Sequence, residues 1–123
     1  MAPERISVAV VDDHPCTLHG LAGFVEMNGA FQVIIKARSG EEMLKALKEG
    51  PLPALALVGL EMEPMNGYTL IALLKERYQL RSLAIASEPD EDAVLRALRA
   101  GGCGVVGKDV EAEELCRALD DVH

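Results

Sequence analysis

Polar residues able to support metal or phosphoryl chemistry come directly after short apolar stretches of this sequence. Two carboxylates, a hydroxyl and an ammonium group, once brought together, are suited to holding a divalent cation and a phosphoryl group. The residues in question are Asp12, Asp13, Glu61, Glu63, Ser87 and Lys108. The sequence predicts one shallow polar cleft, provided that the apolar stretches end at the same edge of a common sheet.

The apolar stretches are short enough to be strands, and segments with helical periodicity separate them. Strands that are apolar on both faces and joined by helices indicate a parallel sheet covered on both sides. Right-handed crossovers then produce a three-layer α/β sandwich, in which sites lie at the carboxyl ends of the strands. The predicted strands are Ile6–Val11, Phe31–Ala37, Ala54–Leu60, Leu83–Ser87 and Cys103–Gly107.

Residues that are typical of helix ends flank the predicted helices. Pro15 suits the first turn of the first helix, and Asn28-Gly29 suits its end. Ser39, Asp90 and Asp109 precede later helical patterns at positions where their side chains can cap the first turn. We therefore expect five strands and five helices in alternation.

Length and charge limit the possible functions. The chain has 123 residues, which predicts a single domain over 1–123, and its net charge is −8. Such a surface repels nucleic-acid phosphates, so we expect no direct nucleic-acid binding by this domain alone. No apolar run approaches the ~20 residues of a membrane-spanning helix. The first residues show no signal peptide, so we expect a cytoplasmic protein without membrane contacts.

The three cysteines are widely spaced and show no metal-binding or redox motif. Cys16, Cys103 and Cys116 form no C-x-x-C pair. We expect reduced, partly buried thiols.

Three segments occur in order along the chain and together resemble a known family. They are VVDDHP at Val10–Pro15, ALALVGLEMEPMNGYTL at Ala54–Leu70 and AGGCGVVGKD at Ala100–Asp109. They resemble the receiver domains of response regulators of the NarL/FixJ class. The resemblance implies a flavodoxin-like (CheY-like) fold, with a five-stranded sheet of order 2-1-3-4-5 and five helices. It also implies a C-terminal helix-turn-helix output domain in the full-length protein, which we expect to be absent from this chain.

The resemblance assigns roles to individual residues of the predicted cleft. Asp12 and Asp13 match the acidic pair that holds Mg²⁺ in the family. Ser87 matches the hydroxyl residue that bonds the phosphoryl group, and Lys108 matches the lysine that pairs with the phosphoaspartate. Gly67 matches the glycine that follows the metal-binding loop.

Other positions depart from the family pattern. Gly59 stands where the phosphoacceptor aspartate is found, so the position has no carboxylate with which to form an acyl phosphate. Val105 stands at the aromatic switch position, and a β-branched side chain has no ring to swing. Glu63 replaces the loop proline, and Glu88 replaces a small residue after Ser87. Both the phosphoacceptor residue and the aromatic switch residue of the family are thus missing from this sequence.

The missing carboxylate leads to expectations for its neighbours. We expect Lys108 to pair with Asp12 or Asp13, and no cofactor beyond weak Mg²⁺ at this acidic pair, since Mg²⁺ demands near-ideal oxygen coordination. Glu61 and Glu63 are predicted on the solvent side of their loop. A further hypothesis has Glu61, Glu63 and Glu88 imitating phosphorylation by fixed negative charge, although exposed charges are screened.

These observations lead to one main functional hypothesis and one alternative. The main hypothesis is a non-enzymatic, phosphorylation-independent receiver that regulates transcription through protein–protein contacts or homodimerisation. The candidate contact faces are the last two helices with the fifth strand, or the first and last helices. The alternative is a sensor that binds a small ligand in extra room over Gly59. Gly59 argues directly against a conventional phosphoacceptor.

Overall fold

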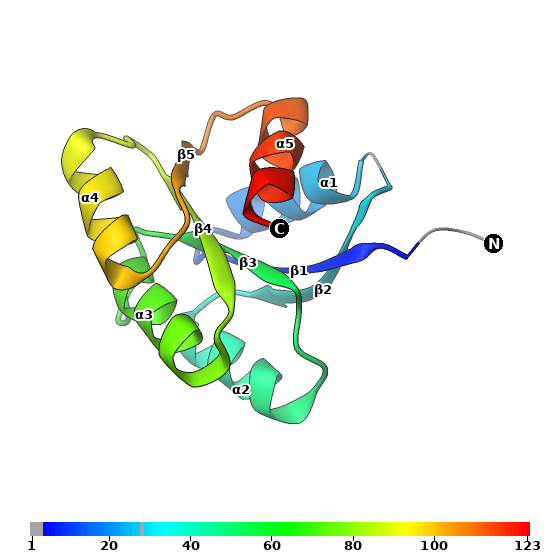
Figure 1. Cartoon of the computed structure of the whole chain (residues 1–123), viewed down its shortest axis with the longest axis horizontal. Coiled ribbons are helices and arrows are strands. Elements are labelled where there is room, and N and C mark those ends of the chain that lie inside the picture. Colours follow the sequence, from blue (N-terminus) through cyan, green and yellow to red (C-terminus); the bar gives the residue numbers. More distant parts are fainter. Residues whose placement is uncertain (1–3, 28) are drawn as a thin grey trace.

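Strands and helices alternate throughout the computed structural model, which describes residues 4–27 and 29–123. The strands are β1 (Ile6–Val11), β2 (Phe31–Ala37), β3 (Leu55–Gly59), β4 (Arg81–Ala86) and β5 (Val105–Gly107). The helices are α1 (Pro15–Glu26), α2 (Gly40–Glu49), α3 (Gly67–Tyr78), α4 (Glu91–Ala100) and α5 (Ala112–Val122). All five strands pair in parallel in the order β2-β1-β3-β4-β5, which confirms the predicted fold (Figure 1).

Helices cover both faces of the sheet and bury two separate apolar cores. Helices α1 and α5 lie on one face, while α2, α3 and α4 lie on the other (Figure 1). Successive residues of β1 alternate between the two: Val8 and Val10 belong to the α1/α5 core, and Ala9 and Val11 to the opposite core. This period of two explains why the strands are apolar on both faces in the sequence.

Some strand boundaries differ from the predicted ones. The first two strands match the prediction, but β3 is one residue shorter at each end and β4 begins two residues earlier. Arg81, a charged residue, is a poor strand signal, yet it pairs with Leu55, and its guanidinium donates to the Val122 carbonyl at 3.1 Å. The edge strand β5 begins only at Val105, where its pairing with Ala84 starts.

The predicted helix signals are confirmed in most cases. Ser39 accepts a hydrogen bond from the Glu42 N–H at 3.1 Å, and Asp90 accepts one from the Ala93 N–H at 2.8 Å. Pro15 opens α1 as predicted, whereas Asn28 lies outside the described residues.

The prediction that Asp109 caps the last helix is wrong. Helix α5 begins at Ala112, and its N-cap is Glu111, whose side chain makes no capping hydrogen bond. The chain needs the residues after Lys108 for a turn, in which the Val110 N–H donates to the Gly107 carbonyl at 3.1 Å.

Gly67 allows α3 to begin directly against the end of β3. A Cβ atom at this position would collide with the backbone of Gly59 and Leu60. The Gly67 N–H donates to the Leu60 carbonyl at 3.0 Å. This close approach holds the loop between β3 and α3 against the sheet.

The structure also shows where the three cysteine thiols lie. Cys16 and Cys103 are exposed, Cys116 is buried, and all three are free. Burial was thus predicted correctly for Cys116 alone.

Within the described ranges, every helix is too short or too polar to cross a membrane.

Candidate functional site

Asp12 is a buried carboxylate at the carboxyl end of β1. Only 1% of the residue is exposed. Its Oδ1 accepts a hydrogen bond from the His14 N–H at 2.9 Å, and its Oδ2 lies 3.8 Å from Lys108 Nζ. Because a buried charge is costly unless it is paired, the ammonium group is what makes this carboxylate tolerable.

Gly59 ends the neighbouring strand β3, and the Asp12 carboxylate occupies the space beside it. A Cβ atom on Gly59 would lie 2.7 Å from Asp12 Oδ2 and 3.4 Å from the Val11 carbonyl oxygen. Extra room is therefore absent at the place that a Cβ atom of residue 59 would take. The buried Asp12 carboxylate takes this space, and Lys108 holds it there.

Asp13 and His14 extend this acidic group toward solvent. His14 Nδ1 lies 2.9 Å from Asp13 Oδ1 and 3.4 Å from Asp12 Oδ1, so a protonated imidazole pairs with both carboxylates. The sequence predicts His14 on the surface or at the start of a helix; its side chain is exposed and it is the N-cap of α1. Its contact with the acids was missed, although its place next to Asp13 in the sequence was an available signal.

Lys108 lies between two carboxylates. Its side chain is 19% exposed, and Nζ is 3.8 Å from Asp12 Oδ2 and 4.0 Å from Glu61 Oε2. The Lys108 N–H donates to the Ala86 carbonyl at 2.9 Å, which places the residue beside the end of β4. The expected pairing of Lys108 with the acidic pair is present, and Asp12 rather than Asp13 is the partner.

Glu61 is exposed as predicted, with 47% of its side chain accessible to solvent, and its carboxylate also contacts Ser87 and Lys108. Its Oε1 accepts a hydrogen bond from the Ser87 N–H at 2.7 Å, and its Oε2 lies 3.4 Å from the Ser87 hydroxyl that donates to it. Glu63 is likewise exposed as predicted, and Glu88 is exposed as well. The contacts of Glu61 were not predicted, because the sequence around it carries no sign that the Ser87 N–H and the Lys108 ammonium group lie within its reach.

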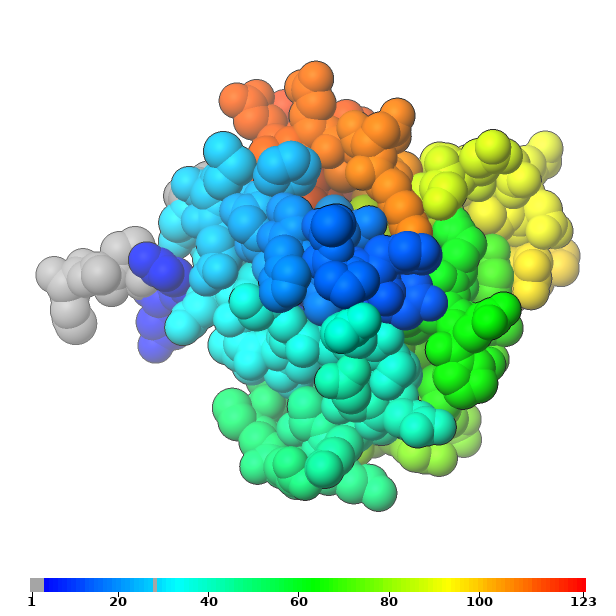
Figure 2. Space-filling view, turned by 180° about the vertical axis from the view of Figure 1, so that it is seen from behind, coloured from blue at the N-terminus to red at the C-terminus, as the bar shows by residue number. Residues whose placement is uncertain are grey.

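These residues lie together at the carboxyl ends of the strands. Figure 2 shows this side of the molecule: the blue segment after β1 lies next to the green segment after β3 and below the orange segment after β5. The structure thus brings Asp12, Asp13, Glu61, Ser87 and Lys108 to one edge of the sheet, as the sequence predicted.

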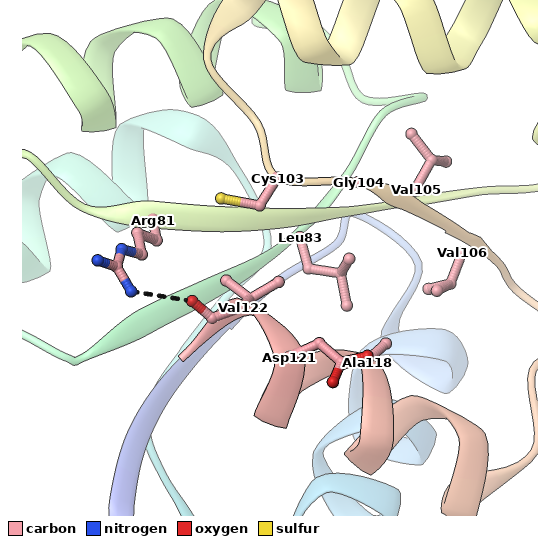
Figure 3. A pocket seen from close by; sticks show the side chains of 9 residues that line it. All are labelled: Arg81, Leu83, Cys103, Gly104, Val105, Val106, Ala118, Asp121 and Val122. Atoms are coloured by element: carbon pink, nitrogen blue, oxygen red, sulfur yellow. Dashed lines mark hydrogen bonds between the residues drawn. The ribbon is translucent and has the colours of Figure 1, made fainter.

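Val105 lies away from this group, on the edge strand β5. It packs against the core of α2, α3 and α4, while Val106 packs on the opposite core. Both border a groove of about 440 Å³ between β4, β5 and the end of α5 (Figure 3). In this view the Arg81 guanidinium bonds the Val122 carbonyl at one end of the groove. Val105 is half-buried, and its short β-branched side chain has no ring that could swing between two positions.

The acidic group fits a magnesium ion poorly. Asp12, Asp13 and His14 can each offer one ligand atom, and these atoms lie within 4.8 Å of one another. However, Mg²⁺ prefers oxygen ligands in octahedral geometry, whereas His14 offers nitrogen and Gly59 offers no side chain. The Lys108 ammonium already neutralises Asp12 Oδ2.

Comparison with known proteins agrees with this architecture. The family described as response regulator receiver domain matches residues 8–120. The DNA-binding transcriptional activator DevR/DosR of Mycobacterium tuberculosis is 32% identical, over 95% of this chain and 54% of its own length. A protein-glutamate methylesterase/protein-glutamine glutaminase of Geobacter sulfurreducens is 29% identical, over 97% of this chain and 32% of its own length.

A solved structure shows the same likeness in three dimensions. The signal receiver domain of NarL from Mycobacterium tuberculosis superimposes with a TM-score of 0.87 at 31% identity, covering 97% of this chain and 96% of that one. The chain spans about half the length of the transcriptional regulators that it matches. The family match over nearly the whole chain and the shared sheet order lead to one conclusion: the chain belongs to the response regulator receiver domain family.

Proposed function

We propose that this chain is a receiver domain that works without phosphorylation and regulates its output through protein–protein contacts, with no reaction of its own. The observation that carries the proposal is the arrangement at Gly59. The position has no side chain, and the Asp12 carboxylate, paired with Lys108, fills the space beside it. An acyl phosphate requires a carboxylate in line with the phosphodonor, and position 59 supplies none.

The neighbouring carboxylates are poor substitutes for the missing one. Asp12 is almost fully buried, and Oδ2, the oxygen nearest to Gly59, faces Lys108. Glu61 is engaged by Ser87 and Lys108. A nucleophile must reach a near-attack position, and each of these groups would first have to break its existing contacts.

The relatives support a role in gene regulation. DevR/DosR is a DNA-binding transcriptional activator, and this chain matches about half of it. We therefore propose that the domain controls transcription through a DNA-binding segment of a longer protein. The methylesterase relative shows that receivers of this kind also occur with an enzyme, so a DNA-binding assay of the full-length protein is the direct check of the output.

Exposed apolar side chains support the proposed protein contacts. Leu95 and Leu98 on α4, and Phe24 and Met27 at α1, are all more than a third exposed. They lie on the two faces considered above, so either face can take a second copy of the chain. Sedimentation velocity over a concentration series tests for the homodimer. Leu98→Glu and Met27→Glu then identify the face, since a charge buried in the interface weakens association.

The experiment that tests phosphorylation independence is treatment with a small phosphodonor and Mg²⁺, followed by intact-mass measurement. We expect no phosphoryl adduct and no spectral change with beryllofluoride. A receiver with an aspartate at the position of Gly59 is treated in parallel to show that the donor is active. A stoichiometric acyl phosphate on this chain would overturn the proposal.

A further inference from the structure

The Glu61 carboxylate occupies a cradle of hydrogen-bond donors that would suit a small oxyanion. Two donors of Ser87 converge on its oxygens, the N–H at 2.7 Å and the hydroxyl at 3.4 Å, and the Lys108 ammonium forms an ion pair with it at 4.0 Å. A backbone N–H, a hydroxyl and an ammonium group are the donors that bind carboxylate and phosphate oxygens in proteins. In this structure the Glu61 side chain of the same molecule takes the place of such an oxyanion.

The backbone pairing of the sheet explains why Glu61 lies there. Gly59 pairs with Ile85 across β3 and β4, and the Leu60 N–H donates to the Ile85 carbonyl at 2.9 Å. Glu61 and Ser87 each follow two residues after that pair, so parallel pairing brings them side by side. Glu63, two residues further along the loop, is exposed and lies beyond this pairing.

The charges around the cradle favour this internal occupant over a free anion. Lys108 faces two carboxylates, those of Asp12 and Glu61, so its single positive charge is already outweighed. An additional oxyanion would meet net negative charge as well as a filled cradle. A tethered carboxylate also competes at a millimolar or higher effective concentration.

We propose that Glu61 is an internal anion that fills the Ser87–Lys108 cradle and thereby keeps free oxyanions out of it. The inference rests on the proposed function, because it explains how the domain holds Ser87 and Lys108 in a bonded arrangement without a phosphoryl group. It also revises the hypothesis of imitation by fixed charge: only Glu61 acts in this way, and it acts through direct contact, whereas Glu63 and Glu88 are solvated.

The test follows the Ser87 amide by two-dimensional NMR during titration with inorganic phosphate. In the unsubstituted chain we expect a strongly hydrogen-bonded Ser87 N–H that phosphate leaves unchanged. In Glu61→Ala we expect this amide to move upfield in the absence of phosphate. Phosphate should then bind to this variant at least about tenfold more tightly, because the tethered competitor is gone. Glu63→Ala is the matched control and should behave like the unsubstituted chain.

Glu61→Gln separates charge from hydrogen bonding. Its amide oxygen still accepts from the Ser87 N–H, so the amide should move less than in Glu61→Ala. The inference is overturned if the Ser87 amide is the same with and without the Glu61 side chain. It is equally overturned if phosphate binds the unsubstituted chain as tightly as Glu61→Ala. Neither result bears on acyl-phosphate formation, so the phosphodonor experiment keeps the proposed function separately testable.

Discussion

At the scale of single residues, the Lys108 ammonium group is the positive charge that faces two carboxylates of the site. Lys108 Nζ lies within 4.0 Å of two carboxylates, and the more buried of them, Asp12, has no hydrogen bond to Oδ2 in the described part of the chain. Burial makes Asp12 dependent on the lysine, whereas nearly half of the Glu61 side chain is exposed to solvent. Substitution of Lys108 should therefore change the stability of the fold by a different amount from substitution of Asp12.

We expect Lys108→Met to destabilise the fold more than Asp12→Asn. Removing the lysine leaves a buried carboxylate whose Oδ2 has no cationic partner, at a cost of about 3 kcal/mol. Removing the Asp12 charge leaves a lysine that can extend toward solvent, at a cost of about 1 kcal/mol. Urea unfolding measures both, and an equal or reversed order would contradict the assigned ion pair.

We expect Gly59→Ala to destabilise the fold although it adds only a methyl group. The new Cβ would lie 2.7 Å from Asp12 Oδ2, so the buried carboxylate must shift, at a cost of about 1–3 kcal/mol. Gly23→Ala in α1 is the matched control, because nothing lies within 4 Å of its new Cβ. There the better helix propensity of alanine should stabilise by about 0.5–1 kcal/mol. Equal effects of the two substitutions in urea unfolding would rule out the crowding at Gly59.

At the scale of elements, the strand ladder places the site and the caps set the ends of the helices. Parallel pairing brings the ends of β1, β3, β4 and β5 to one edge, and there the polar residues meet. Apolar stretches and capping residues predicted most of this in advance. The prediction failed at Asp109 and at the start of β5, since the length of a turn and the edge position of a strand depend on neighbours distant in sequence.

Capping substitutions should separate helices with a side-chain cap from α5, whose N-cap side chain makes no capping hydrogen bond. We expect Ser39→Ala and Asp90→Ala each to lower the free energy of unfolding by about 1 kcal/mol, because each removes an acceptor for a first-turn N–H. Glu111→Ala should change it little, since that side chain makes no capping bond. A loss at Glu111 as large as at Ser39 would contradict the observed start of α5.

At the scale of the whole molecule, two apolar cores on either side of the sheet determine which groups reach solvent. Cys116 belongs to the core formed with α1 and α5, and its sulfur lies 3.5 Å from the Phe24 carbonyl. Burial raises the pKa of the Cys116 thiol above its ordinary value of 9.0, because the thiolate is poorly solvated there. Cys16 and Cys103 lie on the surface.

We expect alkylation of the native chain to label Cys16 and Cys103 rapidly and Cys116 only upon unfolding. The thiolate is the reactive form, and burial both disfavours it and blocks access. The raised pKa also means that the folded state retains this proton more tightly, so stability should fall as the pH rises above about 9. Peptide mapping after a short pulse of reagent checks the labelling. Rapid native modification of Cys116 would contradict its burial.

The sequence by itself determined the layered α/β fold and the absence of a carboxylate at Gly59. Both follow from local information: the apolar pattern of each strand, and the presence or absence of a side chain. Only the tertiary structure decided where the remaining carboxylates lie, with Asp12 beside Gly59 and Glu61 on Ser87. The direction of an acidic side chain depends on which N–H groups and ammonium groups the strand ladder places near it, and those partners come from segments far apart in the sequence.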